Sequence, residues 1–261
     1  MYYGVKMISK SQISYLKSLH QKKYRKEYRQ FIVEGDKLCD EFILSEQKIE
    51  QIYLLDHKRV KYEDLLLKIS KKIEIIVLKS DEMSKISNLS TAPDVLLVAA
   101  MPKELNISDL HVNYDKELVL MLDGVKDPGN MGTIIRIADW YGISYIICSN
   151  DCVELYNPKV VQSTMGSVLR TKIIYTDLAH YLSSLQNIRI YGALLEGENI
   201  YTHADKLRGI LLMGSESHGI AEDLRSYISH PITIPSWGKA ESLNVAVATA
   251  ILCSEAKRRE V

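Results

Sequence analysis

The chain has 261 residues, 46% of them hydrophobic, with 33 Lys and Arg residues against 33 Asp and Glu residues. A chain of this length can bury a sizeable core, and we expect two domains, at residues 1–112 and 116–261. It has no secretory signal and no apolar run of about 18 residues, and its four cysteines lack zinc-type spacing, so we expect a cytoplasmic protein with reduced thiols, no membrane contact and no metal.

The first thirty residues are strongly basic, with eight Lys or Arg side chains and one acid. A helical arm is predicted near 11–28, and tyrosines alternate with its charges at Tyr24 and Tyr28. Such a segment offers both phosphate contact and base stacking, although a solvated helix face is the alternative. The candidate RNA-binding residues are Lys22, Lys23, Arg25, Lys26 and Arg29.

Helical and strand patterns alternate through the rest of the first hundred residues, which predicts a small α/β layer structure. Strands are expected at 31–33, 49–55, 73–78 and 95–100, and helices at 35–44, 63–70 and 81–87. The polar stretch 102–115 has no apolar period and is predicted to be a linker.

The second part opens with a buried strand ending at Asp123, a turn rich in Gly and Pro, and a helix predicted from Thr133 onward. The polar loop between a strand and a helix is where parallel α/β proteins place their sites. Asn130 would lie at the helix entrance, and Arg136 on the face shared with Thr133 and Trp140. The alternatives are a helix cap for Asn130 and an ion pair with Asp139 for Arg136.

Two more segments join an apolar strand or helix to a polar loop. Residues 210–220 form a short strand that runs into a loop bounded by glycines, with Glu216 and His218 at its tip. Residues 234–259 lead into an apolar helix, and Ser242 is predicted to be its N-cap. That cap does not explain Asn244, which precedes the helix interior by one residue.

These three segments, in this order, resemble the SpoU/TrmH family of SPOUT RNA methyltransferases over residues 118–259. The resemblance implies an α/β domain with a deep trefoil knot, a homodimer, and transfer of methyl from S-adenosylmethionine to a ribose 2′-hydroxyl of RNA. Residues 30–43 resemble the ribosomal-protein-like RNA-binding domain that precedes the catalytic domain in many members.

The resemblance also implies the roles of individual residues. Arg136 stands at the position of the family's catalytic arginine, and Asn130, Glu216, Ser242 and Asn244 complete the catalytic set. Loops at 213–220, 234–238 and 242–243 would enclose the cofactor, and no family role transfers to His218. The candidate cofactor-binding residues are Met213, Gly214, Glu216, Ile220, Ile234, Pro235, Ser242 and Leu243.

The expected substrate is structured RNA, with ribosomal RNA favoured by the two-domain layout. Three alternatives remain open: a transfer RNA 2′-O-methyltransferase, a noncatalytic RNA-binding or ribosome-assembly factor, and a base methyltransferase of the wider SPOUT group. The absence of Gly-x-Gly-x-x-Gly after a strand argues against a Rossmann-type cofactor site, and Gly214–Gly219 does not match the Gly-x-Ser-x-Gly of hydrolases.

Overall fold

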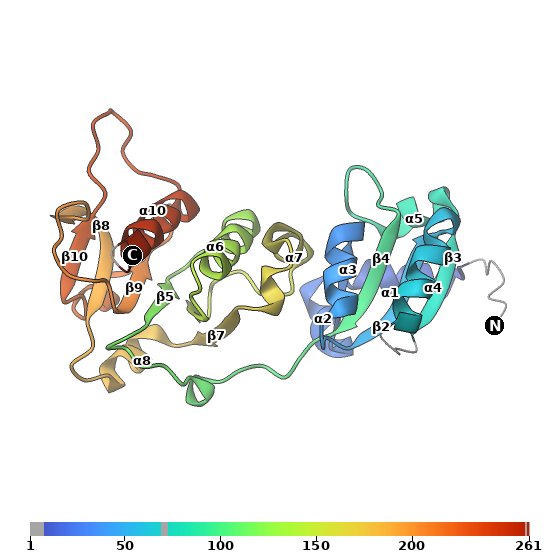
Figure 1. The fold of residues 1–261 in the computed structure, drawn as a ribbon, viewed down its shortest axis with the longest axis horizontal. Helices are drawn as coiled ribbons and strands as arrows, with labels where there is room; N and C mark the ends of the chain where they lie inside the picture. Colours follow the sequence, from blue (N-terminus) through green and yellow to red (C-terminus); the bar gives the residue numbers. More distant parts are fainter. Residues whose placement is uncertain (1–7, 69–72, 259, 261) are drawn as a thin grey trace. The chain divides into compact units, whose positions relative to one another are not determined.

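A computed structural model describes residues 8–68, 73–258 and 260, which form two compact units (Figure 1). The first unit comprises Met1–Lys103 and Tyr156–Leu169, and the second comprises Glu104–Leu155 and Arg170–Val261. The expected boundary at 112–116 would divide the chain into two continuous domains. In the structure, Tyr156–Leu169 instead belongs to the first unit. Ser70, the predicted end of one helix, and Arg259 lie outside the described residues.

The first unit is a four-stranded sheet of order β1-β4-β2-β3, in which only β2 and β3 are parallel. Its strands are β1 (Gln30–Glu34), β2 (Ile49–Leu55), β3 (Glu74–Leu78) and β4 (Val95–Ala100). Its helices are α1 (Lys10–Ser18), α2 (Lys22–Tyr28), α3 (Asp36–Leu44), α4 (Arg59–Lys68), α5 (Ser80–Ile86) and α7 (Pro158–Thr164), with 3-10 turns at Asp56–Lys58 and Ser167–Leu169.

Alternate residues of these strands face opposite layers of the unit. Phe31 of β1 packs with Leu38 of α3 and Leu66 of α4, while Ile32 packs with Leu16 of α1 and Met83 of α5. Because successive strand residues point to opposite faces, one short strand contributes to both cores. The helices and strands that were expected to alternate in this half of the chain therefore form a three-layer α/β structure.

The predicted helical arm at 11–28 is not one helix. Helix α1 ends at Ser18 and α2 begins at Lys22, and Leu19 between them is fully buried. The Leu19 carbonyl accepts a hydrogen bond of 2.8 Å from the Arg25 guanidinium, which satisfies a carbonyl exposed by the helix break.

The second unit is built on six parallel strands in the order β10-β8-β9-β5-β6-β7. The strands are β5 (Leu118–Leu122), β6 (Tyr145–Ser149), β7 (Lys172–Thr176), β8 (Ile190–Asn199), β9 (Gly209–Met213) and β10 (His230–Thr233). The helices are α6 (Pro128–Trp140), α8 (Leu178–Ser184), α9 (Glu222–Arg225) and α10 (Val245–Arg258), with a 3-10 turn at Ile107–Asp109. The α/β class with a parallel sheet is confirmed.

The predicted linker is only partly a connector, because its second half packs on the second unit. Ile107, Leu110, Val112 and Tyr114 are partly buried against the core around β5, β6 and β9. Their spacing is irregular, so no helical or strand period revealed this packing in the sequence.

Candidate active site

The motif loops follow β5, β9 and β10, which are strands of one parallel sheet, so their starting points share one edge. Strands β5 and β9 pair side by side, with Leu122 opposite Met213. The Asp123 amide donates to the Met213 carbonyl at 2.9 Å, and an Asp123 carboxylate oxygen accepts from the Ala221 amide at 2.8 Å. Burial raises the pKa of Asp123. Asp123 therefore ties both ends of the loop after β9 to the end of β5.

The loop from Gly214 to Ile220 closes on itself. Ser215 and Gly219 exchange two backbone hydrogen bonds, of 2.9 and 3.0 Å, and Glu216 and His218 lie exposed at the tip. A Cβ at Gly214 would lie 2.1 Å from the carbonyl carbon of Gly219, so no side chain fits there without moving backbone. Glycine at 214 thus permits the tight loop that presents Glu216.

Helix α6 begins five residues earlier than predicted. Asp127 is the N-cap, its carboxylate accepting from the Asn130 amide at 2.8 Å, and Pro128 is the first helical residue. Proline is favourable at that position because the N–H groups of the first turn make no hydrogen bond within the helix, so the N–H that proline lacks is not needed. Asn130 therefore belongs to the first turn of the helix, and its side chain is not used as the cap.

The side chain of Asn130 connects all three motifs. Its Nδ2 donates to a carboxylate oxygen of Glu216, and its Oδ1 accepts from Nδ2 of Asn244 at 3.0 Å. One amide thus links the helix after β5, the loop after β9 and the segment before α10. Glu216 and Asn130, two of the residues expected in the catalytic set, therefore contact each other directly.

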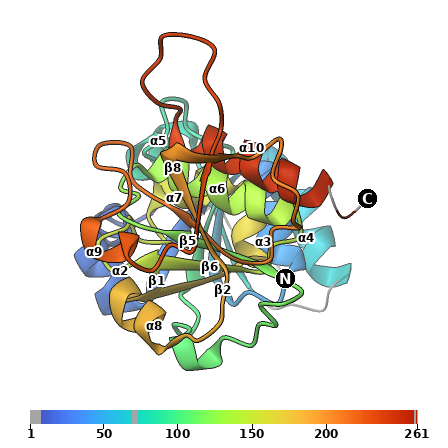
Figure 2. The ribbon, with the colours of Figure 1, turned by 90° about the vertical axis from the view of Figure 1, so that its left-hand side faces the viewer.

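The N-cap of α10 is Asn244, and the prediction of Ser242 in that role is wrong. The Asn244 side-chain oxygen accepts from the amides of Ala246 at 2.9 Å and Val247 at 3.3 Å. Among the described residues, Ser242 makes no side-chain hydrogen bond and is exposed, as is Leu243. Both lie in the loop between β10 and α10, which extends away from the sheet in both views (Figures 1 and 2).

Arg136 is exposed on α6 and makes no ion pair or hydrogen bond within the described part of the chain. The suggested ion pair with Asp139 does not form, because the Asp139 carboxylate binds the Arg170 guanidinium at 2.9 Å. Thr133 and Trp140 are exposed on the same side of the helix. The guanidinium is therefore available to an anionic ligand.

The residues expected to hold the cofactor differ in their surroundings. Met213 and Ile220 are buried at the two ends of the β9 loop, and Ile234 and Pro235 are half-buried after β10. Two of the three predicted loops thus leave the same edge of the sheet, whereas residues 242–243 stand out in solvent.

One predicted RNA-binding residue is a structural one. Arg25 is only 2% exposed, burial lowers its pKa to about 10, and its guanidinium binds the Leu19 carbonyl, so it is unavailable for phosphate contact. Lys22, Lys23 and Lys26 are exposed on α2. Arg29, also exposed, donates to the Pro102 carbonyl at 2.7 Å.

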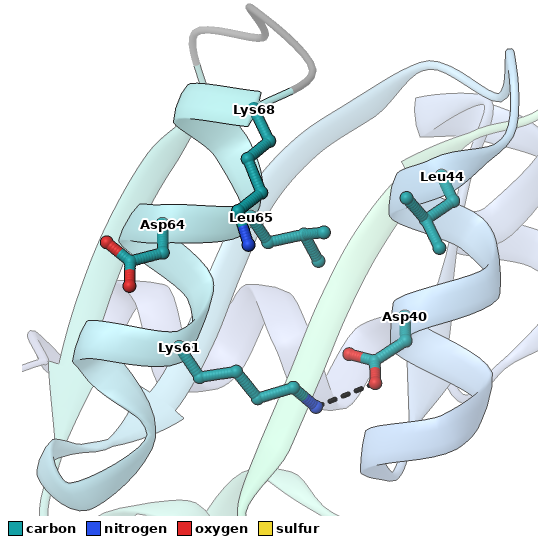
Figure 3. A pocket seen from close by; sticks show the side chains of 6 residues that line it. All are labelled: Asp40, Leu44, Lys61, Asp64, Leu65 and Lys68. Carbon is teal, nitrogen blue, oxygen red and sulfur yellow. Dashed lines mark hydrogen bonds and ion pairs between the residues drawn. The ribbon is translucent and has the colours of Figure 1, made fainter.

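A cavity of about 310 Å³ lies in the first unit between α3 and α4 (Figure 3). A 2.6 Å ion pair between Lys61 and Asp40 joins the two helices in its lining, and one further lysine and one further aspartate line it. Its balanced charge gives it no preference for an anion. In the described ranges no three His, Cys, Asp or Glu residues gather as metal ligands would, and no helix there is long and apolar enough to cross a membrane.

The sequence argument did not assign a role to two residues that build the site, Asp123 and Asp127. Asp127 followed by Pro128 is a recognisable helix start, because a carboxylate caps and proline occupies the first turn. Asp123 has a weaker signal, since an acid at the end of a buried strand does not reveal which backbone amide it accepts from.

This arrangement defines an α/β enzyme with a polar cluster at the carboxyl edge of a parallel sheet and an exposed arginine six residues farther along α6. The profile of the SpoU rRNA methylase family matches residues 117–254, and that of an MRM3-like substrate binding domain matches residues 10–97. The chain therefore belongs to the SpoU rRNA methylase family.

Particular relatives span both units. The chain is 29% identical over 239 residues to the 23S rRNA (guanosine(2553)-2′-O)-methyltransferase RlmP of Bacillus subtilis, covering 90% of this chain and 92% of the relative. A solved TrmH-family structure from Porphyromonas gingivalis has 35% identity and a TM-score of 0.82, covering 97% of this chain and all of that one. An rRNA methyltransferase from Sinorhizobium meliloti, solved with AdoMet bound, has 28% identity, a TM-score of 0.85 and 98% coverage of both chains.

Proposed function

We propose that this protein transfers the methyl group of S-adenosylmethionine to a ribose 2′-hydroxyl of ribosomal RNA. The observation that carries the proposal is the hydrogen-bonded chain Glu216, Asn130 and Asn244, which joins the three family motifs. A protein that only bound RNA would not need this cluster beside an unpaired arginine. The curated relative RlmP, named for 23S rRNA, favours ribosomal over transfer RNA as the substrate.

Arg136 acts through its charge. A guanidinium keeps its proton at neutral pH and presents a planar fork of donors that matches a phosphate. On the exposed face of α6, that fork clamps the phosphate next to the target ribose and stabilises negative charge as it develops on the 2′-oxygen. Its freedom from intramolecular partners leaves all of its donors for the RNA.

Asn130, Asn244 and Glu216 orient the ribose. Glu216 and Asn244 fix the amide plane of Asn130 from opposite sides, because one accepts from its nitrogen and the other donates to its oxygen. A hydroxyl attacks efficiently only when it is held in line with the transferred methyl group. Ser242 joins this set once the loop after β10 closes over the bound ligands.

The chemistry that S-adenosylmethionine supplies is an activated methyl group on a sulfonium. The donor set fits its adenosine part, because the β9 loop offers backbone groups beside buried Met213 and Ile220, and the chain after β10 adds half-buried Ile234 and Pro235. Gly214 keeps this loop narrow, and Leu243, which is exposed in this structure, completes the pocket when the loop after β10 closes.

The first unit selects the RNA, as its match to a substrate-binding domain supports. On α2 the rings of Tyr24 and Tyr28 stack at 6.1 Å, and Tyr28 also meets Tyr15 edge-on at 5.5 Å. Lys22, Lys23 and Lys26 surround these rings with positive charge, while Arg29 stands beside them. Phosphate contacts position RNA without reading its sequence, whereas the rings accept an unpaired base.

The architecture of the active form follows the family. The trefoil knot is supported by the strand order, in which β8, β9 and β10 lie on one side of β5 while α10 packs back against α6. The homodimer follows from membership of the family, and Val247, 49% exposed on α10, is one residue that a second copy would cover. The protein works in the cytoplasm, where ribosomal RNA is made in bacteria.

Incubation of the purified protein with methyl-tritiated S-adenosylmethionine and unmodified ribosomal RNA tests the proposal. Label should appear in RNA, survive treatment with a chelator, and be recovered as a 2′-O-methylnucleoside after nuclease digestion. Label on a base would assign the protein to the base-modifying branch. No label, together with no cofactor binding by calorimetry, would make it a noncatalytic RNA-binding protein.

A further inference from the structure

Two exposed aromatic rings stack on each other outside the motif residues. The centroids of Tyr201 and Trp237 are 6.4 Å apart and their planes are inclined by 23°. Trp237 is 85% exposed and Tyr201 41% exposed. Large aromatic side chains dominate binding energetics when they are covered, so an indole left this open marks a contact surface.

Tyr201 is a rigid support for this pair. Its amide donates to the side-chain oxygen of Asn199 at 2.9 Å, in a turn that also binds the amides of Thr202 and His203 to the Asn199 carbonyl. Ile200, between them, is fully buried and donates its amide to Thr233 at the end of β10. These hydrogen bonds therefore fix the backbone that carries Tyr201 before any ligand arrives.

Trp237 belongs to the loop that leads to the active site. The loop leaves β10 after Thr233, carries Trp237 and Lys239, and ends at Asn244, which binds Asn130. A ligand resting on the indole thus contacts the same loop that ends at the catalytic cluster, with six residues, 238–243, between Trp237 and Asn244. Lys239 is exposed and forms no ion pair with any described residue.

We propose that the Trp237–Tyr201 stack is a platform for an unpaired base of the RNA, next to the nucleotide that is methylated. This rests on the proposed function and assigns it a further positioning residue. A base has a flat π-face that matches the open face of the indole, and base–aromatic stacking tolerates any base. Lys239 then contacts the phosphate of the same nucleotide.

The pair suits a base better than a protein surface. A stack of two rings presents a flat face, and the chain neighbours of the indole are polar or glycine, Ser236 and Gly238. Obligate protein interfaces are broader and more apolar than two rings.

Fluorescence isolates this contact because the chain has two tryptophans. In the Trp140→Phe variant the emission reports Trp237 alone, and a short single-stranded RNA oligonucleotide should quench it. An abasic oligonucleotide of the same length, which keeps the phosphates and lacks the rings, should leave it unchanged. The reciprocal variant Trp237→Phe reports Trp140 and should show no difference between the two oligonucleotides.

Quenching by S-adenosylmethionine alone, or by protein concentration alone, would overturn the proposal in favour of a cofactor cap or a subunit interface. Trp237→Ala should raise the KM for RNA about tenfold, and Trp237→Phe should restore most of the loss. Because residues 234–238 also belong to a loop expected to enclose the cofactor, the KM for S-adenosylmethionine is measured alongside and should change less than the KM for RNA. Leu67→Ala, an exposed residue of the first unit, is the matched control. Methyl transfer by Trp237→Ala equal to that of an active wild-type protein would refute the platform alone, whereas an inactive wild type would refute the proposed function.

Discussion

Asn244 has two separable tasks, and one substitution removes only one of them. Its side-chain oxygen caps α10 through the amides of Ala246 and Val247, while its nitrogen donates to Asn130. Asn244→Asp keeps an oxygen for the cap, because Asp and Asn cap equally well, and places a negative charge at the helix N-terminus, where it is favourable. It loses the donor to Asn130.

The magnitudes distinguish Asn244→Asp from Asn244→Ala. The alanine variant loses the cap and should destabilise the second unit by about 1 kcal/mol, whereas the aspartate variant should stay within about 0.5 kcal/mol of wild type. Both should lose methyl transfer by about 10- to 100-fold, because a misplaced Asn130 no longer orients the ribose.

Both tryptophans lie in the second unit, so indole fluorescence during urea denaturation follows the unfolding of that unit. Transfer of tritiated methyl to RNA measures activity on the same samples. Ser242→Ala, at an exposed residue without a side-chain hydrogen bond, is the stability control. An aspartate variant as active as wild type, or as unstable as the alanine variant, would refute the reasoning.

Three further predictions test other parts of the account. Arg136→Ala and Arg136→Lys should both abolish methyl transfer, while cofactor binding measured by calorimetry stays near normal. The lysine variant should fail because a point charge cannot replace the planar guanidinium. Methyl transfer by either variant would contradict the role assigned to Arg136. Replacing Lys22, Lys23 and Lys26 by Ala should weaken RNA binding. The slope of log affinity against log salt concentration should fall by up to about one unit per lysine. Unchanged binding across a salt series would show that α2 does not bind RNA. Burial raises the pKa of Glu34, against the hydrogen bond from Ser87, so the folded state holds this proton more tightly than the unfolded chain. The stability that this group contributes is thus lost as pH rises through the folded pKa. Glu34→Gln should therefore raise the calorimetric melting temperature at about pH 8, and this increase should shrink toward about pH 4. An equal increase at both pH values would contradict the raised pKa.

The sequence predicted element types better than their exact ends. The strands at 49–55 and 95–100 match the structure residue for residue. Residues 95–100 form a continuous apolar run between Asp94 and Pro102, whose limits are clear, whereas Glu50 and Gln51 interrupt the first run. The start of α6 was missed, since the Gly and Pro of residues 127–132 read as a turn although proline is compatible with a first helical turn.

Side-chain tasks were harder to predict than positions. Ser242 and Asn244 are both good capping residues, and only the backbone geometry decides which of them faces the amides of Ala246 and Val247. Arg25 read as a surface cation because its neighbours are lysines, yet the break between α1 and α2 turns it toward the Leu19 carbonyl. Both outcomes depend on the path of the backbone around these residues, which local composition does not encode.

The most direct test of the central claim is a map of ribose methylation in ribosomal RNA from cells with and without the gene. Ribose 2′-O-methylation protects the adjacent phosphodiester bond from alkaline hydrolysis, so a methylated position appears as a gap in the cleavage pattern. The account predicts that one gap disappears when the gene is deleted, returns with the wild-type gene, and does not return with Arg136→Ala. Identical patterns of ribosomal RNA with and without the gene would contradict it.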